Sequence, residues 1–353
     1  MTNKKHTYLI TGGCGFIGSC LIRNLAKKNN YLINIDKISY ASNEKSVGNV
    51  NKSNYLLIKK DIRDPIFLKN VFNKYKPNYV IHLAAESHVD RSIDRPEDFI
   101  FTNIVGTYNL LNSAYDYWNK TNRDKNFRFL YVSTDEVYGS LKSKDKSFKE
   151  NSLIKPNSPY AASKASGDLL AYSWFKTYGL PIVMTNSSNN YGIWQFPEKL
   201  IPLVIQKCLR NKNIPIYGKG KQIRDWINVE DHVDGIIKVL AKGISGEKYN
   251  IGANNEISNL DLVKLICSLM DKLKPKSDGK YSNLITFVED RPGHDFRYSL
   301  DTRKINRQLS WKARINFKKG LNETIKWYLS NKDWLNSIEE SKYDGKRLGR
   351  LRK

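Results

Sequence analysis

Cysteine is scarce in this chain, and the few cysteines are not arranged for a disulfide framework or a zinc site. Only four of the 353 residues are cysteine, and none has CxxC spacing or a nearby histidine. Zinc sites and small disulfide-rich domains both need several such residues at short, regular spacings. The five histidines show no ligand spacing either, so we expect no metal. The expected reduced thiols are Cys14, Cys20, Cys208 and Cys267.

Long apolar runs are missing as well. No run approaches the roughly 20 residues needed to cross a bilayer. The first residues, MTNKKH, lead almost directly into the apolar TYLI, without the apolar region or cleavage site of a signal peptide. We therefore expect a cytoplasmic protein with no membrane partner.

Acidic residues are few relative to basic ones. Lysine and arginine total 59 against 35 acidic residues, which gives a formal net charge of +24. Such an excess can support binding to nucleic acid. The lysines, however, are spread along the whole chain, and the only dense basic run is 346–353. We therefore interpret the charge as solvated surface and expect no nucleic-acid partner.

Short apolar runs alternate with helical patterns through the first half of the chain, which is typical of a doubly wound α/β domain with a parallel Rossmann sheet. After residue 186 the elements become shorter and mixed, which indicates a smaller α/β C-terminal substrate domain. The expected strands are 6–10, 31–36, 54–61, 78–85, 127–134 and 180–186, and the expected helices include 16–28, 96–118 and 159–179. The expected domains are 1–186 for NAD, with segments after about 226 returning to it, 187–330 mainly for the nucleotide sugar, and 331–353 as a helix and basic tail.

A glycine-rich motif, TGGCGFIG, joins the first strand to the first helix. Gly12, Gly15 and Gly18 allow a tight turn in which backbone amides approach a pyrophosphate at the positive end of the helix. Asp36 ends the second strand near the expected offset, where its carboxylate can accept hydrogen bonds from an adenosine ribose. An acid there repels a 2′-phosphate, so NAD is predicted over NADP. Asp61 and Ile62 lie at the end of the third strand, where either an adenine site or a simple acidic turn fits.

A second motif, YAASK, places Tyr160 and Lys164 four residues apart on one face of a helix. A nearby ammonium lowers the pKa of a phenol, so this spacing predicts a tyrosine that acts as a base. Thr134, at the end of the fifth strand, belongs to the same constellation.

Longer blocks extend these motifs. The ordered set TGGCGFIG, YAASK and LAAESHVDRSI resembles the extended short-chain dehydrogenases/reductases that act on nucleotide sugars. Within that group STDEVYG, NSSNNYGIWQFPEKLIP, GKQIRDWINVEDH and EDRPGHDFRYSLD are similar to the dTDP-glucose 4,6-dehydratases, from about residue 8 to residue 327. The chain departs from the usual family pattern at Cys14, at Asn186 with Ser187, and at Ile193 with Trp194.

The resemblance implies a lyase that uses NAD and dTDP-glucose. Oxidation of the sugar C4 hydroxyl makes the C5 hydrogen acidic, and loss of water across C5 and C6 then needs both a base and an acid. By resemblance Asp135 is the acid and Glu136 the base. Adjacent residues on a strand point to opposite faces, so both serve one substrate only if the chain has already left the strand. The alternative is that both acids merely cap a helical turn.

The remaining site residues follow from the resemblance alone. For the cofactor they are Phe16, Ile17, Lys37, Ala84, Ala85, Thr102 and Asn190, in addition to the glycines, Asp36, Asp61, Ile62, Tyr160 and Lys164. For the substrate they are Ser87, Thr134, Asn189, Lys199, Leu200, Pro215, Tyr217, Arg224, Asn259 and His294. Arg224 suits a diphosphate because its guanidinium pairs with two oxygens at once, and the alternative for it is a surface salt bridge with Asp225 or Asp231.

The resemblance also implies a homodimer, since the helices around 101–118 and 169–178 carry more apolar surface than one sheet face needs. Three other functions stay open. An NAD-dependent epimerase or decarboxylase would use Tyr160 and Lys164 without the two acids. A UDP-glucose 4,6-dehydratase would differ only in binding uracil instead of thymine. An NAD-bound sensor would not turn over at all.

Overall fold

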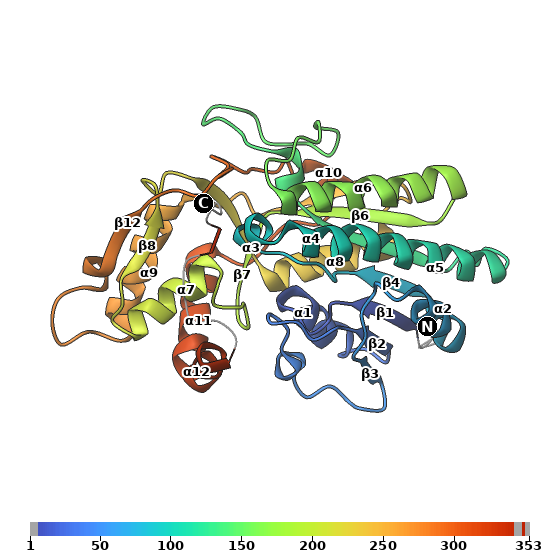
Figure 1. Cartoon of the computed structure of the whole chain (residues 1–353), viewed down its shortest axis with the longest axis horizontal. Coiled ribbons are helices and arrows are strands. Elements are labelled where there is room, and N and C mark those ends of the chain that lie inside the picture. The colour runs from blue at the N-terminus through green and yellow to red at the C-terminus, as the bar shows by residue number, and fades with distance from the viewer. Residues whose placement is uncertain (1–5, 342–347, 350–353) are drawn as a thin grey trace.

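A seven-stranded parallel sheet organises the larger part of the chain (Figure 1). The computed structural model describes residues 6–341 and 348–349, so the basic run 346–353 lies almost wholly outside the described residues. The strand order is β3-β2-β1-β4-β5-β6-β10. The strands are β1 (Thr7–Thr11), β2 (Tyr31–Ile35), β3 (Tyr55–Ile58), β4 (Tyr79–His82), β5 (Arg128–Thr134), β6 (Ile182–Ser187) and β10 (Lys248–Ile251).

Helices cover both faces of this sheet because successive residues of each strand are apolar and point in opposite directions. On one face, Ile10 and Ile81 pack with α1 (Phe16–Leu25), α8 (Val229–Lys242) and α10 (Arg303–Leu309). On the other face, Leu9 and Val80 pack with a second group of helices. That group is α2 (Pro65–Tyr75), α5 (Thr107–Lys120) and α6 (Pro159–Tyr178). The expected doubly wound α/β fold is therefore confirmed.

Two of the expected helices differ in detail. The first ends at Leu25 instead of residue 28, because the side chain of Asn30 donates to the carbonyl of Leu25 and the chain turns there. The helix expected over 96–118 is interrupted: α4 (Pro96–Phe99) runs into a π-helical segment, η2 (Ile100–Gly106), before α5 begins. The periodicity of 3.6 residues does not reveal a π segment, since it inserts only a local extra residue per turn.

A smaller C-terminal domain lies beside the carboxyl ends of the sheet strands. It has a three-stranded sheet of β7 (Asn189–Tyr191), β9 (Ile223–Asn228) and β11 (Glu256–Ser258), and a parallel pair of β8 (Ile214–Tyr217) and β12 (Ile285–Val288). A separate buried cluster, which includes Trp226, Ile266 and Tyr328, holds it together. Its helices are α7 (Leu200–Leu209), α9 (Asn259–Leu273), α11 (Phe317–Ser330) and α12 (Lys332–Ser341).

Short elements complete the described chain. They are α3 (Val89–Asp94) and the single turns η1 (Glu44–Val47), η3 (Asp135–Tyr138) and η4 (Tyr281–Leu284). α3 and η3 lie beside a cavity, whereas η1 packs on α1 and η4 on α9. No helix within residues 6–341 is both long enough and apolar enough to span a membrane.

Candidate active site

One cavity of about 450 Å³ lies at the carboxyl ends of the parallel strands, where the C-terminal domain meets the sheet. This is the position at which doubly wound folds bind their ligands. Every residue that the sequence and the resemblance predicted for a site lines it. Those residues are Gly12, Gly15, Phe16, Ile17, Gly18, Asp36, Lys37, Asp61, Ile62, Ala84, Ala85, Ser87, Thr102, Thr134, Asp135, Glu136, Tyr160, Lys164, Asn189, Asn190, Lys199, Leu200, Pro215, Tyr217, Arg224, Asn259 and His294.

The glycine-rich turn requires glycine for space as well as for backbone conformation. Gly12 has a φ of +75°, and a Cβ there would lie 2.7 Å from the backbone of Ala84. A Cβ on Gly18 would lie 2.2 Å from the carbonyl oxygen of Gly12. The first turn of α1 is thereby brought against the end of β1, with Gly15 at the N-cap. This cradle fits the pyrophosphate of a dinucleotide at a helix N-terminus.

Asp36 is held rigidly at the end of β2. Its Oδ2 accepts a hydrogen bond from the backbone N–H of Cys14 at 2.9 Å. Its Oδ1 accepts from the N–H of Ile38 at 2.8 Å and from the hydroxyl of Ser42 at 2.9 Å. A carboxylate offers about four acceptor positions, so one position on Oδ2 remains for a ribose hydroxyl.

The other groups at this end of the cavity pair within the protein. Lys37 forms an ion pair with Glu86 at 2.7 Å. Asp61 accepts from both the backbone and the guanidinium of Arg63, which is the acidic turn that the sequence left as an alternative to an adenine site. Asp61 and Ile62 nevertheless both line the cavity, so the two interpretations are compatible.

The two adjacent acids, Asp135 and Glu136, lie just after the end of a strand, so strand geometry does not send their side chains to opposite faces. β5 ends at Thr134, and Asp135 and Glu136 begin the single turn η3, so both side chains reach the same cavity. The cap of that turn is Thr134, whose hydroxyl accepts from the N–H of Glu136 at 3.3 Å and donates to Asp135 Oδ1 at 3.2 Å. The acids themselves are therefore not needed as the cap.

Burial makes the two acids unequal. Burial and the charge of Glu136 raise the pKa of Asp135 well above its usual range. Burial also raises the pKa of Glu136, but the cations Arg291, Arg224 and Lys199 oppose that rise. Within the described residues, no group hydrogen-bonds to Asp135 Oδ2. The arrangement favours a protonated Asp135 beside an ionised Glu136, which is the pair that an elimination needs.

The prediction that Lys164 lowers the pKa of Tyr160 is wrong for this structure. Nζ of Lys164 donates to the carbonyl of Val132 at 2.7 Å and lies over the ring of Tyr131. Burial and the charge of Glu136 raise the pKa of Tyr160 above its ordinary value. Burial also lowers the pKa of Lys164 to about 8. Helical spacing placed both groups in the cavity, but the lysine bonds to the main chain of β5.

Arg224 does not form the surface salt bridge that was its alternative. The side chain is only 5% exposed, and its NH2 donates to the carbonyl of Asp295 at 2.9 Å. Its guanidinium lies 4.1 Å from the ring centroid of Tyr298. Asp225 and Asp231 instead accept backbone N–H groups of other segments. Arg224 is therefore a buried cation at the wall of the cavity.

The substrate side of the cavity is held by contacts between distant segments. Lys199 Nζ donates to the carbonyl of Ser87 at 2.7 Å, and Asn190 Oδ1 pairs with Nδ1 of His232 at 2.8 Å. Nδ1 of His294 lies 2.6 Å from Asp290 Oδ1. Burial, together with the nearby Arg291 and Arg224, lowers the pKa of His294 to about 4, so the imidazole is neutral near pH 7.

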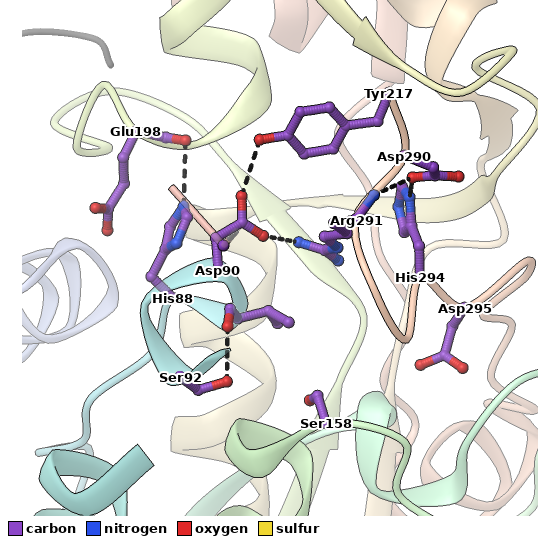
Figure 2. A network of polar contacts seen from close by, with 12 residues as sticks. His88, Asp90, Ser92, Ser158, Glu198, Tyr217, Asp290, Arg291, His294 and Asp295 are labelled. Carbon is purple, nitrogen blue, oxygen red and sulfur yellow. Dashed lines mark hydrogen bonds and ion pairs between the residues drawn. The ribbon is translucent and has the colours of Figure 1, made fainter. Parts of the chain in front are cut away.

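Sequence reasoning missed several polar residues that line the same cavity. They are His88, Asp90, Glu198, Arg291 and Tyr298. Asp90 and Arg291 form an ion pair at 2.5 Å, although they are 201 positions apart in the chain. Figure 2 shows Asp90 between Tyr217 and Arg291. All five lie within the three family blocks LAAESHVDRSI, NSSNNYGIWQFPEKLIP and EDRPGHDFRYSLD. The polar side chains of those blocks were therefore the signal that could have identified them.

Comparisons with known proteins agree on one kind of enzyme. A family model described as GDP-mannose 4,6 dehydratase matches residues 9–324. The chain is 49% identical to a probable dTDP-glucose 4,6-dehydratase of Sinorhizobium fredii, over 98% of this chain and 99% of that one. It is 52% identical to the dTDP-glucose 4,6-dehydratase of Haemophilus influenzae, over 92% and 98% of the two chains.

Solved structures show the same likeness. The crystal structure of DesIV, a dTDP-glucose 4,6-dehydratase of Streptomyces venezuelae with NAD bound, has a TM-score of 0.86 and 39% identity, and covers 94% of this chain and 99% of that one. A UDP-glucose 4-epimerase of Thermotoga maritima has a TM-score of 0.81 with 26% identity, covering 92% and 99% of the two chains. The fold is thus shared with epimerases, whereas the higher identity lies with dehydratases.

Proposed function

The chain belongs to the family of dTDP-glucose 4,6-dehydratases, and we propose that it converts dTDP-glucose into dTDP-4-keto-6-deoxyglucose with NAD as a recycled cofactor. One observation carries the proposal: Asp135 and Glu136 open into the same cavity as the glycine-rich turn and Tyr160. An epimerase needs no such pair of acids. The product is the kind of keto sugar from which deoxysugars are made.

The first part of the reaction is oxidation at C4. Bound in the cradle of Gly12, Gly15 and Gly18, NAD supplies the acceptor for the C4 hydride and later the hydride for C6. Tyr160 takes the proton of the C4 hydroxyl, and Thr134 lines the cavity beside it at the end of β5. Lys164 lines the same cavity, but its Nζ is fixed on the carbonyl of Val132, so the proposal does not require it to lower the pKa of Tyr160.

The second part is elimination across C5 and C6. Glu136, whose raised pKa is opposed by the cations around it, takes the C5 proton as the electrons move toward the C4 ketone. Asp135, kept protonated by burial, gives its proton to the departing C6 hydroxyl, which leaves as water. Return of the hydride to C6 and of a proton to C5 would then complete the cycle, so the sugar loses one water and undergoes no net oxidation.

A wall of cations supports the assignment of a diphosphate substrate. Arg224, Arg291 and Lys199 all line the cavity and lie near enough to Glu136 to lower the pKa of its carboxyl; Arg224 is buried, and the other two are partly exposed. A guanidinium presents donors in a planar fork that matches two phosphate oxygens. The cations support the predicted division of labour, in which residues 1–186, with segments after about 226, mainly hold NAD and 187–330 mainly hold the nucleotide sugar.

Incubation of the purified protein with dTDP-glucose, without added NAD, tests the function. Loss of one water with turnover supports dehydration. Unchanged mass with galactose stereochemistry would instead establish an epimerase, and no conversion would favour a sensor. A parallel incubation with UDP-glucose measures selectivity for the base, for which one methyl group contributes only about 1–3 kcal/mol.

We also propose a cytoplasmic homodimer. An apolar surface runs along η2, α5 and α6, which lie side by side (Figure 1). It consists of Ile100, Phe101, Val105, Tyr108, Leu169 and Tyr172, each between 37% and 57% exposed. Paired across a two-fold axis, these helices would form a four-helix bundle. Light scattering tests this: Phe101→Glu should yield monomers, whereas a dimer of unchanged stability would place the interface elsewhere.

A further inference from the structure

Asp90 connects the sheet side of the cavity with the C-terminal domain. It lies on α3 and is only 4% exposed. Its Oδ1 pairs with NH1 of Arg291 at 2.5 Å, and its Oδ2 accepts from the hydroxyl of Tyr217 at 3.0 Å. Figure 2 shows the carboxylate between these two partners, which come from the loop after β12 and from β8. One carboxylate therefore fixes two cavity-lining groups of the other domain.

Arg291 is held on both its side chain and its backbone, but its Nε lacks a partner among the described residues. Its backbone N–H donates to Asp290 Oδ1 at 2.8 Å, and that same oxygen lies 2.6 Å from Nδ1 of His294. In the described part of the chain, its Nε has no hydrogen-bond acceptor although the atom is buried. A buried guanidinium donor without an acceptor is costly unless a ligand supplies one. An anionic ligand in the cavity would satisfy it.

Gly349, in the C-terminal segment, contacts α3 at Asp90 and Asp94. The N–H of Gly349 donates to Asp94 Oδ2 at 3.0 Å. Gly349 has a φ of +74°, and a Cβ on it would lie 2.9 Å from Cβ of Asp90 and 3.1 Å from its Cα. Side chains larger than hydrogen therefore cannot occupy this position unless α3 shifts. The contact brings a residue near the end of the chain to the back of the cavity wall.

We propose that Asp90 is a positioning residue for the substrate diphosphate, acting through Arg291 and Tyr217, and that Gly349 holds Asp90 in place from behind. The inference rests on the proposed function, because it takes a nucleotide diphosphate as the ligand. Asp90 fixes the Arg291 guanidinium at the cavity wall, and its Nε, unpartnered within the part of the chain that the structure describes, is the donor that a bound diphosphate would satisfy. Binding of the nucleotide part should depend strongly on Asp90, whereas the chemistry at Glu136 should change less, because Arg224 and Lys199 also lower the pKa of Glu136 and Asp90 does not contact them.

Asp90→Asn tests the first half, since it keeps the shape and removes the charge that Arg291 pairs with. We expect KM for dTDP-glucose and Kd for dTDP alone to rise about 10- to 100-fold, the range for losing a hydrogen bond to a charged group. kcat and the content of bound NAD should stay within about threefold, which is less than the effect of losing a hydrogen bond to a charged group. A fall in kcat with unchanged KM and Kd would overturn the proposal.

Gly349→Ala tests the second half, with Gly179→Ala as its matched control. Gly179 has a φ of +75°, but a Cβ there meets no atom within 4 Å. The two positions have nearly the same positive φ, and only a Cβ at residue 349 meets Asp90. We expect Gly349→Ala to weaken dTDP binding and Gly179→Ala to leave it unchanged. Equal effects of the two variants would contradict the role of Gly349.

Combining Asp90→Asn with Gly349→Ala gives a further check. If both act on the same contact, the double variant should bind dTDP little worse than Asp90→Asn alone, because interacting sites are not additive. Fully additive losses would separate the two residues. Binding of dTDP is measured without turnover, so a wild-type protein that binds dTDP but does not dehydrate dTDP-glucose would refute the proposed function and leave this inference standing.

Discussion

Replacing Asp135 with asparagine separates its role as an acid from its role in folding. The side chain is 2% exposed, and burial with the charge of Glu136 raises its pKa, which favours the protonated form. Asparagine has nearly the same shape as a protonated aspartate, and its Oδ1 still accepts from Thr134, which donates at 3.2 Å in the wild type. We therefore expect the free energy of unfolding to change by less than about 1 kcal/mol, as for other isosteric changes.

Activity should respond much more strongly than stability. A positioned general acid contributes about 10²- to 10⁴-fold to a rate, which corresponds to about 2.7–5.4 kcal/mol of activation free energy. The amide of Asp135→Asn can donate a hydrogen bond but cannot deliver a proton to the C6 hydroxyl. Glu136 remains, so the variant should exchange the C5 hydrogen with solvent faster than it loses water.

The assay follows deuterium uptake at C5 and loss of water in the same sample, in deuterated buffer. Glu136→Gln serves as the matched comparison, since it should still oxidise C4 yet fail to exchange C5. The opposite pattern would exchange the two roles. If both variants dehydrated at the wild-type rate, the reasoning from burial and charge at this pair would be refuted.

The other predictions concern the cofactor end of the cavity. Tyr160→Phe should slow formation of bound NADH by about 10²- to 10⁴-fold in rapid-mixing absorbance while sugar-nucleotide binding stays intact; normal NADH formation would place the base elsewhere. Asp36→Ala should weaken NAD retention and reduce discrimination against NADP, and an unchanged ratio of the two affinities would exclude its ribose role. Because burial lowers the pKa of Lys164 to about 8, the folded state carries a penalty for the ammonium below that pH, and the penalty disappears as pH rises toward the ordinary lysine value. Relative to Lys164→Met, the wild-type free energy of unfolding should therefore rise by about 3 kcal/mol across this window in denaturant titrations, and parallel profiles would contradict the shift.

The fold was largely predictable because each sheet strand is a short apolar run followed by a helix. Burial on both faces makes such runs unambiguous, as Leu9 and Ile10 illustrate by packing against opposite helix layers. The last strand of the sheet, β10, was not assigned, since its four residues lie among the mixed elements of the second half. Local pattern cannot show that Lys248–Ile251 pairs with β6, because that pairing depends on the topology of the whole chain.

The site was predictable where spacing along the chain reflects position in space. The glycine turn, Asp36 and Tyr160 all lie at or near the ends of strands or helices that the pattern reveals. What no pattern revealed was the partner of each group. Lys164 bonds to Val132 of β5, and Asp90 bonds to Arg291 far along the chain, because tertiary packing decides which groups meet.

The most direct measurement follows the hydrogen on C4 of the substrate. dTDP-glucose deuterated at C4 is incubated with the protein and no added NAD, and the product is analysed by mass and by NMR. We predict a product lighter by one water, with the deuterium retained and found at C6, because the hydride never leaves the cavity. Deuterium lost to solvent, deuterium still at C4, or a product of unchanged mass would contradict the account.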